Sequence, residues 1–255
     1  MPEDSHPAPL QIVLVSPRNP LNIGAAARAM ANFGFTHLTV VAPYAPHWQE
    51  ARSAIGASDL LQNAKVSTTL AGAVADCTLV VGTGTLTHRK PEQPVVTLPD
   101  LPSRLIPEIE RGGRVALVFG PEKHGLTRED LSCCHLLVEI PTHPHQPSMN
   151  LGQAVAVCLY ELAARLTAPA RINIQPHPSS SHPAAPDAPS ADLELLSGVI
   201  EKVMLAAAYS PPSMQDANRH DLRLFLRRLA LTRRDARRVL GFFRRVLHRL
   251  ERWSE

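Results

Sequence analysis

Short apolar runs alternate with segments of helical periodicity over the first two thirds of the chain. Several runs are rich in β-branched residues and are typical of buried strands: 11–15, 37–41, 78–82, 115–120 and 136–140. Helical spacing is clearest at 25–33, where Gly34 ends the pattern, and at 150–166. Strands that are apolar throughout are buried on both faces. Their alternation with helices therefore predicts a parallel α/β sheet with helices on both sides.

The end of the chain shows helical periodicity alone. Apolar residues recur at helical spacing over 193–207 and 222–229, and a third stretch from Thr232 carries apolar residues on one face and arginines on the other. A segment rich in proline and serine, 167–191, separates these helices from the α/β part. The sequence predicts a body at 1–166, a linker at 167–191 and a small all-α tail at 192–255.

Charge distinguishes the tail from the body. The 255 residues carry a formal net charge of +3, but residues 219–255 hold 12 arginines and no lysine against four acidic residues, whereas residues 1–218 sum to −5. Guanidinium groups match phosphate oxygens, so this basic module favours a nucleic-acid partner. Aromatic residues make up only 4% of the chain, which argues against base stacking as the main mode of recognition.

Cysteine usage and the N-terminal residues indicate a reducing compartment. The four cysteines show no CxxC spacing and are expected to be free thiols. The chain begins with acidic residues and prolines rather than a signal peptide, and no apolar run is long enough to span a bilayer. We therefore expect a cytoplasmic protein with no membrane partner. No metal site is predicted, because the spacings of these neighbouring cysteines and histidines fit no usual zinc pattern: Cys133, Cys134, His135, His143 and His145.

Familiar nucleotide-binding signatures do not account for this sheet. Gly82 and Gly84 begin like a dinucleotide fingerprint, but Thr87 stands where the third glycine belongs. No GxxxxGK[ST] pattern occurs, which makes a P-loop hydrolase improbable. The chemistry must therefore be sought in other loops that follow strands.

Three such loops carry polar residues where an open parallel sheet binds ligands. The first holds Asn22, a candidate helix N-cap, and Arg28, a cation among alanines that favours a carboxylate or phosphate partner. The second, 120–126, places Glu122 between two glycines that let a ligand approach the backbone. The third is stiffened by prolines and ends with Ser148 and Asn150, of which capping explains one. Each loop alone also fits a surface arginine, a turn or a cap.

Together, the three loops resemble a known set of motifs. NIGAAAR at 22–28, LVFGPEKHGL at 117–126 and IPTHPHQPSMNLGQAVAV at 140–157 are similar in order and spacing to the motifs of the SpoU/TrmH branch of the SPOUT RNA methyltransferases. The layout of body, linker and helical tail further resembles members of that branch that methylate the ribose of cytidine or uridine at position 32 of the tRNA anticodon loop.

The resemblance implies a fold, a cofactor and an assembly. The α/β sheet would be of the SPOUT type, its C-terminal segment would form a trefoil knot, and two subunits of a homodimer would together shape each active site. The methyl donor would be S-adenosylmethionine. It would lie against these residues: Thr83, Gly84, Thr85, Gly120, Ile140, Pro147, Ser148 and Met149.

The resemblance also implies roles for a catalytic set, which comprises Arg28, Asn22, Glu122, Ser148 and Asn150. Arg28 would be the base that activates the ribose 2′-hydroxyl. A guanidinium normally stays protonated, however, so phosphate binding and ribose alignment are the alternative role for Arg28. Asn22 would orient Arg28 or the ribose, and Glu122 would position that side of the pocket. Leu86, Gln146 and Pro121 depart from the usual family residues, which leaves the choice of nucleotide open.

RNA binding is expected mainly in the tail. The candidate residues are Arg28, Arg89, Arg234, Arg237, Arg238, Arg244 and Arg245. A solvated helix face, or a calmodulin-like or membrane-surface target, is the alternative for the arginine-rich helix. The tail could also clamp a dimer. The sequence thus favours 2′-O-methylation of tRNA, with another RNA such as rRNA, or a catalytically silent RNA-binding protein, as rivals.

Overall fold

The computed structural model describes residues 10–84, 91–166, 187–209 and 211–253. Within them, seven parallel strands form one sheet in the order β3-β2-β1-β6-β4-β7-β5. The strands are β1 (Leu10–Val15), β2 (Leu38–Val41), β3 (Lys65–Ser67), β4 (Leu79–Thr83), β5 (Val95–Thr97), β6 (Val115–Phe119) and β7 (Leu136–Glu139). The predicted parallel α/β sheet is confirmed. The short strands β3 and β5 were missed because both lie at sheet edges and carry exposed residues, so they form no apolar run.

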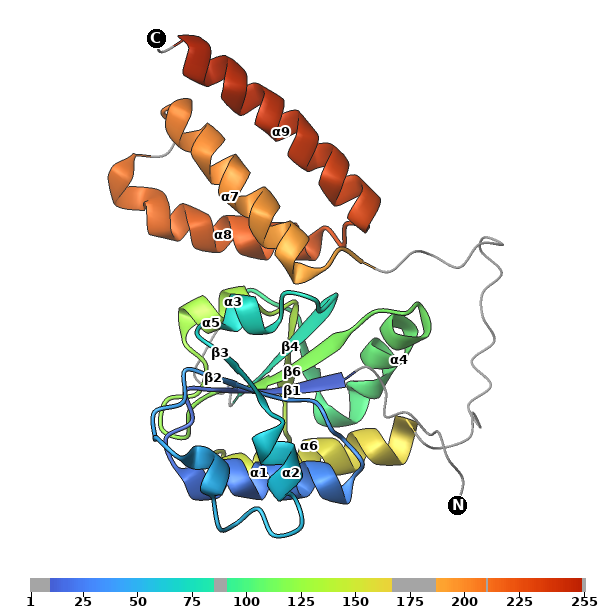
Figure 1. Cartoon of the computed structure of the whole chain (residues 1–255). Coiled ribbons are helices and arrows are strands. Elements are labelled where there is room, and N and C mark those ends of the chain that lie inside the picture. Colours follow the sequence, from blue (N-terminus) through green and yellow to red (C-terminus); the bar gives the residue numbers. More distant parts are fainter. Residues whose placement is uncertain (1–9, 85–90, 167–186, 210, 254–255) are drawn as a thin grey trace, which may run out of the picture.

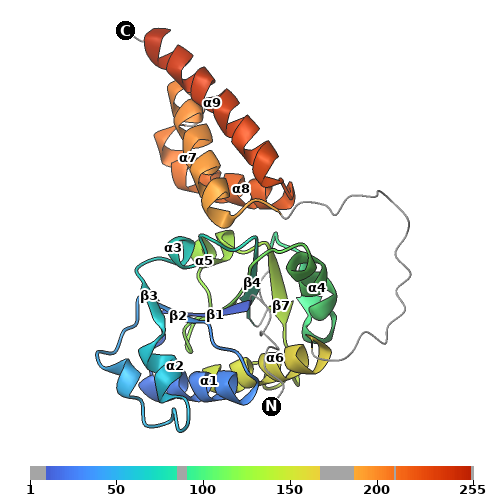
Figure 2. The same cartoon turned by 45° about the vertical axis from the view of Figure 1, so that its right-hand side comes forward.

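Helices cover both faces of the sheet, as Figures 1 and 2 show. Side chains alternate along β1, so that Ile12 and Leu14 join one core while Val13 and Val15 join the other. The first core is covered by α1 (Pro20–Asn32), α2 (Ser58–Gln62), α4 (Pro102–Glu110) and α6 (Leu151–Leu166), and the second by α3 (Leu70–Ala73) and α5 (Arg128–Ser132). Short 3-10 turns lie at Trp48–Glu50, Leu98–Asp100 and Pro212–Met214.

Three further helices lie beyond α3 and α5 (Figure 1). They are α7 (Ser190–Ala206), α8 (Gln215–Arg228) and α9 (Arg233–Trp253). Their small cores contain Leu193, Leu196, Leu226, Ala236 and Leu240. No helix in the described residues is long and apolar enough to cross a membrane.

The boundary before α7 differs from the expected one. Residues 167–186 of the expected linker lie outside the described residues, but α7 already begins at Ser190. The Ser190 hydroxyl is buried and donates to the Cys77 carbonyl oxygen at 3.0 Å, and Asp187 bridges to Thr232. The end of the expected linker is therefore held by the body and by the start of α9.

The start of α1 also differs from the prediction. Asn19, not Asn22, is the N-cap, and its side chain accepts a hydrogen bond from the backbone of Leu21. Pro20 is the first helical residue, a position where its missing N–H costs nothing. Asn22 lies inside the first turn, so its amide is free for other contacts. The Asn19-Pro20 pair was the overlooked signal in the sequence.

Ion pairs attach α8 to α7 and to the body. The Arg223 guanidinium binds Glu129 of α5 and, at 2.8 Å, Glu194 of α7. Arg227 binds the other oxygen of Glu194 at 2.8 Å, and its side chain is only 2% exposed. Four of the tail's arginines are thereby used within the chain, because Arg219 and Arg233 also form ion pairs.

Replacing Arg227 with alanine is expected to destabilise the fold. Glu194 would keep Arg223 but lose one buried partner, so the free energy of unfolding should fall by about 2 kcal/mol. Urea unfolding followed by circular dichroism measures this change. Arg228→Ala is the matched control, since Arg228 is exposed on the same helix. Equal stability of the two variants would show that the buried pair contributes nothing.

Candidate active site

The ends of three neighbouring strands define the candidate site. β6, β4 and β7 are adjacent and parallel, so their carboxyl ends meet at one edge of the sheet. Gly84 follows β4, Gly120 follows β6 and Ile140 follows β7. The fold therefore brings together three of the residues assigned to cofactor binding. The first and the last of them, Gly84 and Ile140, are 56 positions apart in the sequence.

The end of β4 is anchored and open. The Thr83 hydroxyl is buried and donates to the Val118 carbonyl oxygen at 2.9 Å. The Gly84 N–H donates to the Val138 carbonyl oxygen, and a Cβ at Gly84 would meet no atom of the described residues within 4 Å. As far as these residues show, the strand end is open on the side where a Cβ of residue 84 would lie. Thr85 and Arg89 lie outside the described residues.

Gly120 lies where the chain makes a close turn. A Cβ there would lie 2.3 Å from the Leu126 backbone nitrogen and 2.4 Å from the Gly125 carbonyl carbon. Gly125 itself has a φ of 64°, which favours glycine. The close approach at Gly120 is therefore made by the chain's own turn, which folds back on the strand end.

The loop from Ile140 to Asn150 is closed by the Thr142 hydroxyl, which donates to the Pro147 carbonyl oxygen at 3.3 Å. Ile140, Pro147 and Met149 are half-buried, while Ser148 is exposed. This arrangement offers apolar surface in the loop that follows β7, and apolar lining is typical of small-molecule sites.

A hydrogen-bonded network joins the three motif loops. The Glu122 carboxylate accepts from the Asn22 amide at 2.8 Å and from the backbone N–H groups of Arg18 and Asn19, each at 3.2 Å. The Asn150 amide donates to the Asn22 side-chain oxygen at 2.9 Å. Residues more than 100 positions apart thereby share one network, which fixes the side chains of Asn22 and Glu122.

Asn150 has a second task at the start of α6. Its side-chain oxygen accepts from the Gly152 N–H at 2.9 Å and from the Gln153 N–H at 3.4 Å, which is N-capping. Capping thus explains Asn150 but not Ser148. The Asn150 side-chain oxygen thus caps α6, while its nitrogen binds Asn22 of α1. These bonds align α6 and α1 at the site.

The network keeps Glu122 ionised. Burial alone raises the pKa of this carboxyl. The hydrogen bonds from Asn22 and from backbone N–H groups, including those of Arg18 and Asn19, outweigh burial and hold its pKa below the ordinary range. A carboxylate at this position can orient amide donors but cannot supply a proton at neutral pH.

Replacing Glu122 with glutamine should loosen the network. The new amide group of glutamine would face N–H donors, so the free energy of unfolding should fall. The fall should be only about 1 kcal/mol at neutral pH, because this side chain is exposed. A lowered pKa stabilises the fold above the pKa of the unfolded chain, and this contribution disappears as the pH falls through the folded value. Urea titrations of both proteins from pH 7 to pH 3 should therefore converge in acid. A difference that persists in acid would contradict the assignment.

Arg28 lies apart from this network in the described chain. It is exposed on α1, and its side chain makes no hydrogen bond or ion pair with any other residue of the described ranges. Asn22 and Arg28 are six residues apart, so about 3.6 residues per turn place them on different faces of the helix. The structure thus brings together Asn22, Glu122 and Asn150, but it does not join Arg28 or Ser148 to them.

Sequence reasoning overlooked the backbone contribution of residues 18 and 19. Their N–H groups bind Glu122 because the chain turns sharply after β1. The signal available was the segment SPRNP, whose prolines force a loop directly after the strand.

The exposed arginines of α9 form the basic surface of the tail. Arg233 pairs with Asp192, but the other seven form no ion pair within the part of the chain that the structure describes: Arg234, Arg237, Arg238, Arg244, Arg245, Arg249 and Arg252. Their apolar neighbours on the opposite face pack toward α7, as Ala236 and Leu240 do. This face can therefore meet phosphates without breaking internal contacts.

The cysteines and histidines of the body have structural surroundings. The Val80 N–H donates to His135 Nδ1 at 3.0 Å, and burial lowers the pKa of this imidazole to about 3. Burial also raises the pKa of Cys133 to about 11, so its thiol stays protonated. Elsewhere, ligand atoms of Glu92, His220 and Asp221 lie within 4.8 Å of one another between the body and α8.

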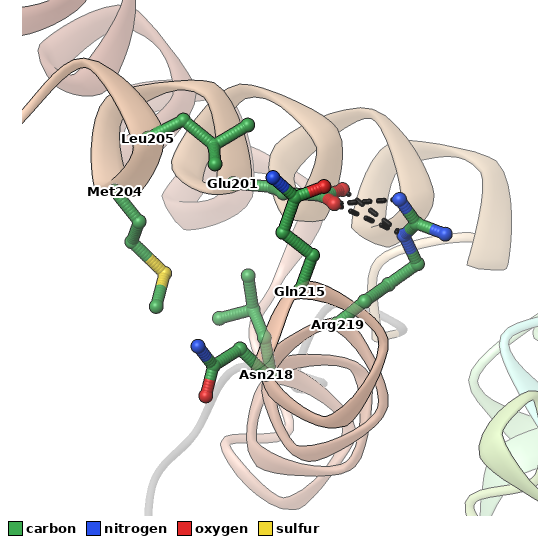
Figure 3. A pocket seen from close by; sticks show the side chains of 7 residues that line it. Glu201, Met204, Leu205, Gln215, Asn218 and Arg219 are labelled. Atoms are coloured by element: carbon green, nitrogen blue, oxygen red, sulfur yellow. Dashed lines mark hydrogen bonds and ion pairs between the residues drawn. The ribbon is translucent and has the colours of Figure 1, made fainter. Parts of the chain in front are cut away.

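A pocket in the tail lies away from the strand ends. Figure 3 shows it between α7 and α8, where the Arg219–Glu201 ion pair spans one wall. It is a shallow hollow lined by Glu201, Met204, Leu205, Gln215, Asn218, Arg219 and Leu222. None of the motif residues reaches it, so it is not the candidate site.

Comparisons with known proteins agree with this geometry. A family model described as the SpoU rRNA Methylase family matches residues 9–160. The chain is 35% identical over 249 residues to the tRNA (cytidine/uridine-2′-O-)-methyltransferase TrmJ of Klebsiella pneumoniae, which covers 96% of this chain and 98% of that relative.

Two further matches differ in extent. The chain is 41% identical over 154 residues to the tRNA (cytidine/uridine/adenosine-2′-O-)-methyltransferase TrmJ of Pseudomonas aeruginosa, so the match spans 60% of each chain. Among solved structures, TrmJ from Z. mobilis ZM4 matches with a TM-score of 0.79 at 31% identity, over 92% of this chain and 98% of that one.

Proposed function

Since this chain belongs to the SpoU rRNA Methylase family, we propose that it transfers a methyl group from S-adenosylmethionine to a ribose 2′-hydroxyl of tRNA. The observation that carries the proposal is the network of Glu122, Asn22 and Asn150 beside the carboxyl ends of β4, β6 and β7. It places ordered amide groups next to a site with open backbone, which suits the alignment of a sugar against a small cofactor.

The residues at the strand ends fit the cofactor. Gly84 leaves open space, and half-buried Ile140, Pro147 and Met149 offer apolar contacts for an adenine ring. Thr83, Thr85, Gly120 and Ser148 complete the proposed binding set. When bound, S-adenosylmethionine supplies an activated methyl group on its sulfonium.

The chain's own residues would prepare the acceptor. A ribose hydroxyl is a poor nucleophile at neutral pH, so holding it in line and accepting its proton both raise the rate. Asn22 and Asn150 orient the ribose, Glu122 holds Asn22, and Ser148 shapes the site around the methyl group. Arg28 binds the neighbouring phosphate and aligns the ribose, or accepts the hydroxyl proton.

The substrate is proposed from the relatives and from the tail. The full-length K. pneumoniae relative is named for cytidine and uridine 2′-O-methylation of tRNA, and the match includes the tail region. We expect position 32 of the anticodon loop to be the target nucleotide. Arg28, Arg89 and the α9 arginines would bind the RNA backbone, and the cytoplasm would be the site of action.

A homodimer is the proposed assembly. Leu21 of α1 and Tyr160 of α6 expose 54% and 61% of their surface on the same layer of the body, where Arg28 is also exposed. A second subunit on this layer would cover apolar surface and could bring Arg28 to a site. Light scattering on the purified chain tests the dimer, and a mass of about 28 kDa would contradict it.

We also propose the trefoil knot of the family for the segment that leads into α6.

Ribosomal RNA is the second candidate substrate, because the description of the matching family model names rRNA. A single assay separates these possibilities. The purified chain is incubated with methyl-labelled S-adenosylmethionine and either unmodified tRNA or rRNA, and the labelled nucleosides are mapped. Label in a 2′-O-methylpyrimidine of tRNA is expected. Label only in rRNA would favour the second candidate, and cofactor binding without transfer would favour a silent RNA-binding protein.

A further inference from the structure

Tyr44 and Arg18 form an exposed pair next to the network. The Arg18 guanidinium carbon lies 5.5 Å from the centroid of the Tyr44 ring, within the range of a cation–π contact. Tyr44 is 75% exposed, and Arg18 is exposed as well. Aromatic residues are few in this chain, so an almost uncovered tyrosine held by a guanidinium is not part of its core.

The backbone beneath the pair is strained and tied together. Ser16 and Ala42, which directly follow β1 and β2, have φ values of 45° and 43°, a conformation that costs free energy for residues other than glycine. The Ser16 N–H donates to the Val41 carbonyl oxygen at 2.8 Å, and the Tyr44 N–H donates to the Pro17 carbonyl oxygen at 3.3 Å. The two loops therefore hold one fixed geometry.

The pair is joined to the site through the main chain. The Arg18 N–H donates to Glu122 at 3.2 Å, and the same carboxylate accepts from the Asn22 amide at 2.8 Å. The side chain of Arg18 is thus free to lie on Tyr44 while its backbone belongs to the network. A nucleotide whose ribose lies at Asn22 would have its base within reach of this ring.

We propose that Tyr44 and Arg18 form a stacking platform for the nucleobase of the nucleotide that is methylated. A ribose inside a stacked loop cannot reach the network, so the nucleotide must be turned out, and its base then needs a new stacking partner. A planar ring and a planar guanidinium both provide one, and they do so for either pyrimidine. This inference rests on the proposed function and adds a base-binding subsite to it.

The platform agrees with the low aromatic content of the chain. One tyrosine suffices to hold one base, while the remainder of the RNA is bound through its backbone. The platform would explain why the strain at Ser16 and Ala42 is retained, because relaxing it would move the ring away from the network.

A fluorescent anticodon stem-loop RNA tests the platform. Pyrrolocytidine at position 32 loses fluorescence when it stacks, so the full-length chain should quench it. Tyr44→Phe should preserve the quenching, whereas Tyr44→Ala should abolish it. In the methylation assay, kcat/KM for tRNA should fall at least about tenfold in Tyr44→Ala, with unchanged cofactor affinity and thermal stability.

Tyr209→Ala is the matched control, since Tyr209 is 74% exposed but lies in the tail. Arg18→Ala keeps the N–H that binds Glu122 and should weaken quenching without loosening the network. Binding of the RNA with no Tyr44-dependent quenching, or equal kcat/KM for Tyr44→Ala and the unmodified chain, would overturn the platform. Tyr44-dependent quenching by a chain that methylates no RNA would support the platform and contradict the proposed function.

Discussion

Replacing Arg28 with alanine is expected to abolish methyl transfer while the affinity for S-adenosylmethionine stays nearly intact. Arg28 is exposed on α1 and its side chain makes no hydrogen bond or ion pair within residues 10–84, 91–166, 187–209 and 211–253, so its removal should not disturb the fold. Loss of a group that aligns the ribose or accepts its proton lowers the rate by on the order of 10²- to 10⁴-fold. Transfer of labelled methyl groups to tRNA measures this loss, and calorimetry measures cofactor binding.

The control for this prediction is Arg104→Ala. Arg104 is likewise an exposed arginine on a helix, but α4 carries none of the motif residues. Activity of Arg28→Ala equal to that of Arg104→Ala would end the catalytic assignment. Arg28→Lys separates the two proposed roles, because lysine can bind a phosphate but lacks the planar fork that aligns two oxygens.

Mixing two inactive variants tests whether Arg28 serves the partner's site. In the described chain Arg28 does not join the Asn22 network, and a homodimer would supply it from the second subunit. Arg28→Ala and Asn150→Ala chains mixed at equal amounts should then recover up to about a quarter of the activity, because half of the dimers are mixed and each has one complete site. No recovery on subunit exchange would place Arg28 in its own subunit's site.

Neutralising the arginine face of α9 is expected to weaken tRNA binding by on the order of 100-fold while cofactor affinity is unchanged. The variant replaces four exposed arginines with glutamine: Arg237, Arg238, Arg244 and Arg245. If each contacts one phosphate, the slope of log affinity against log salt should fall by about 3 to 4. Binding to tRNA at several salt concentrations measures both quantities.

Lysine at the same four positions is the matched control, because it keeps the charge and should retain most of the affinity.

Deleting residues 192–255 should also weaken tRNA binding, but the deletion is the poorer experiment. Ser190 donates to the Cys77 carbonyl oxygen and Arg223 binds Glu129, so the deletion would uncover part of the body. Unchanged tRNA affinity of the glutamine variant at moderate salt would contradict an RNA-binding role for this face.

Much of the sheet could be predicted because its strands are buried on both faces. β6 is apolar from end to end, β1 is apolar except for Gln11, and both lie in the middle of the sheet, so the sequence pattern alone identifies them. β3 and β5 have only three residues each, and both lie at an edge where exposed side chains carry no pattern. Their pairing depends on a neighbouring strand that is distant in sequence.

The candidate site was predictable in its members but not in its contacts. Asn22 was interpreted as a cap because a short polar residue before a helix usually is one. The Asn19-Pro20 pair takes that position, which leaves the Asn22 amide to Glu122 and Asn150. The close approach of Gly125 and Leu126 to Gly120 is likewise a contact that no local pattern predicts.

By itself, the sequence determined three properties. The chain forms a parallel α/β sheet, polar loops follow certain strands of that sheet, and the basic charge is concentrated at one end of the chain. These properties depend on local composition and periodicity. Only the tertiary structure decided which of the arginines are free and which are held in ion pairs, and that Glu122, Asn22 and Asn150 share hydrogen bonds. The hydrogen bonds join residues 100 and 128 positions apart, and the ion pairs join different helices. Both kinds of contact form only where the fold brings donor and acceptor within about 3 Å.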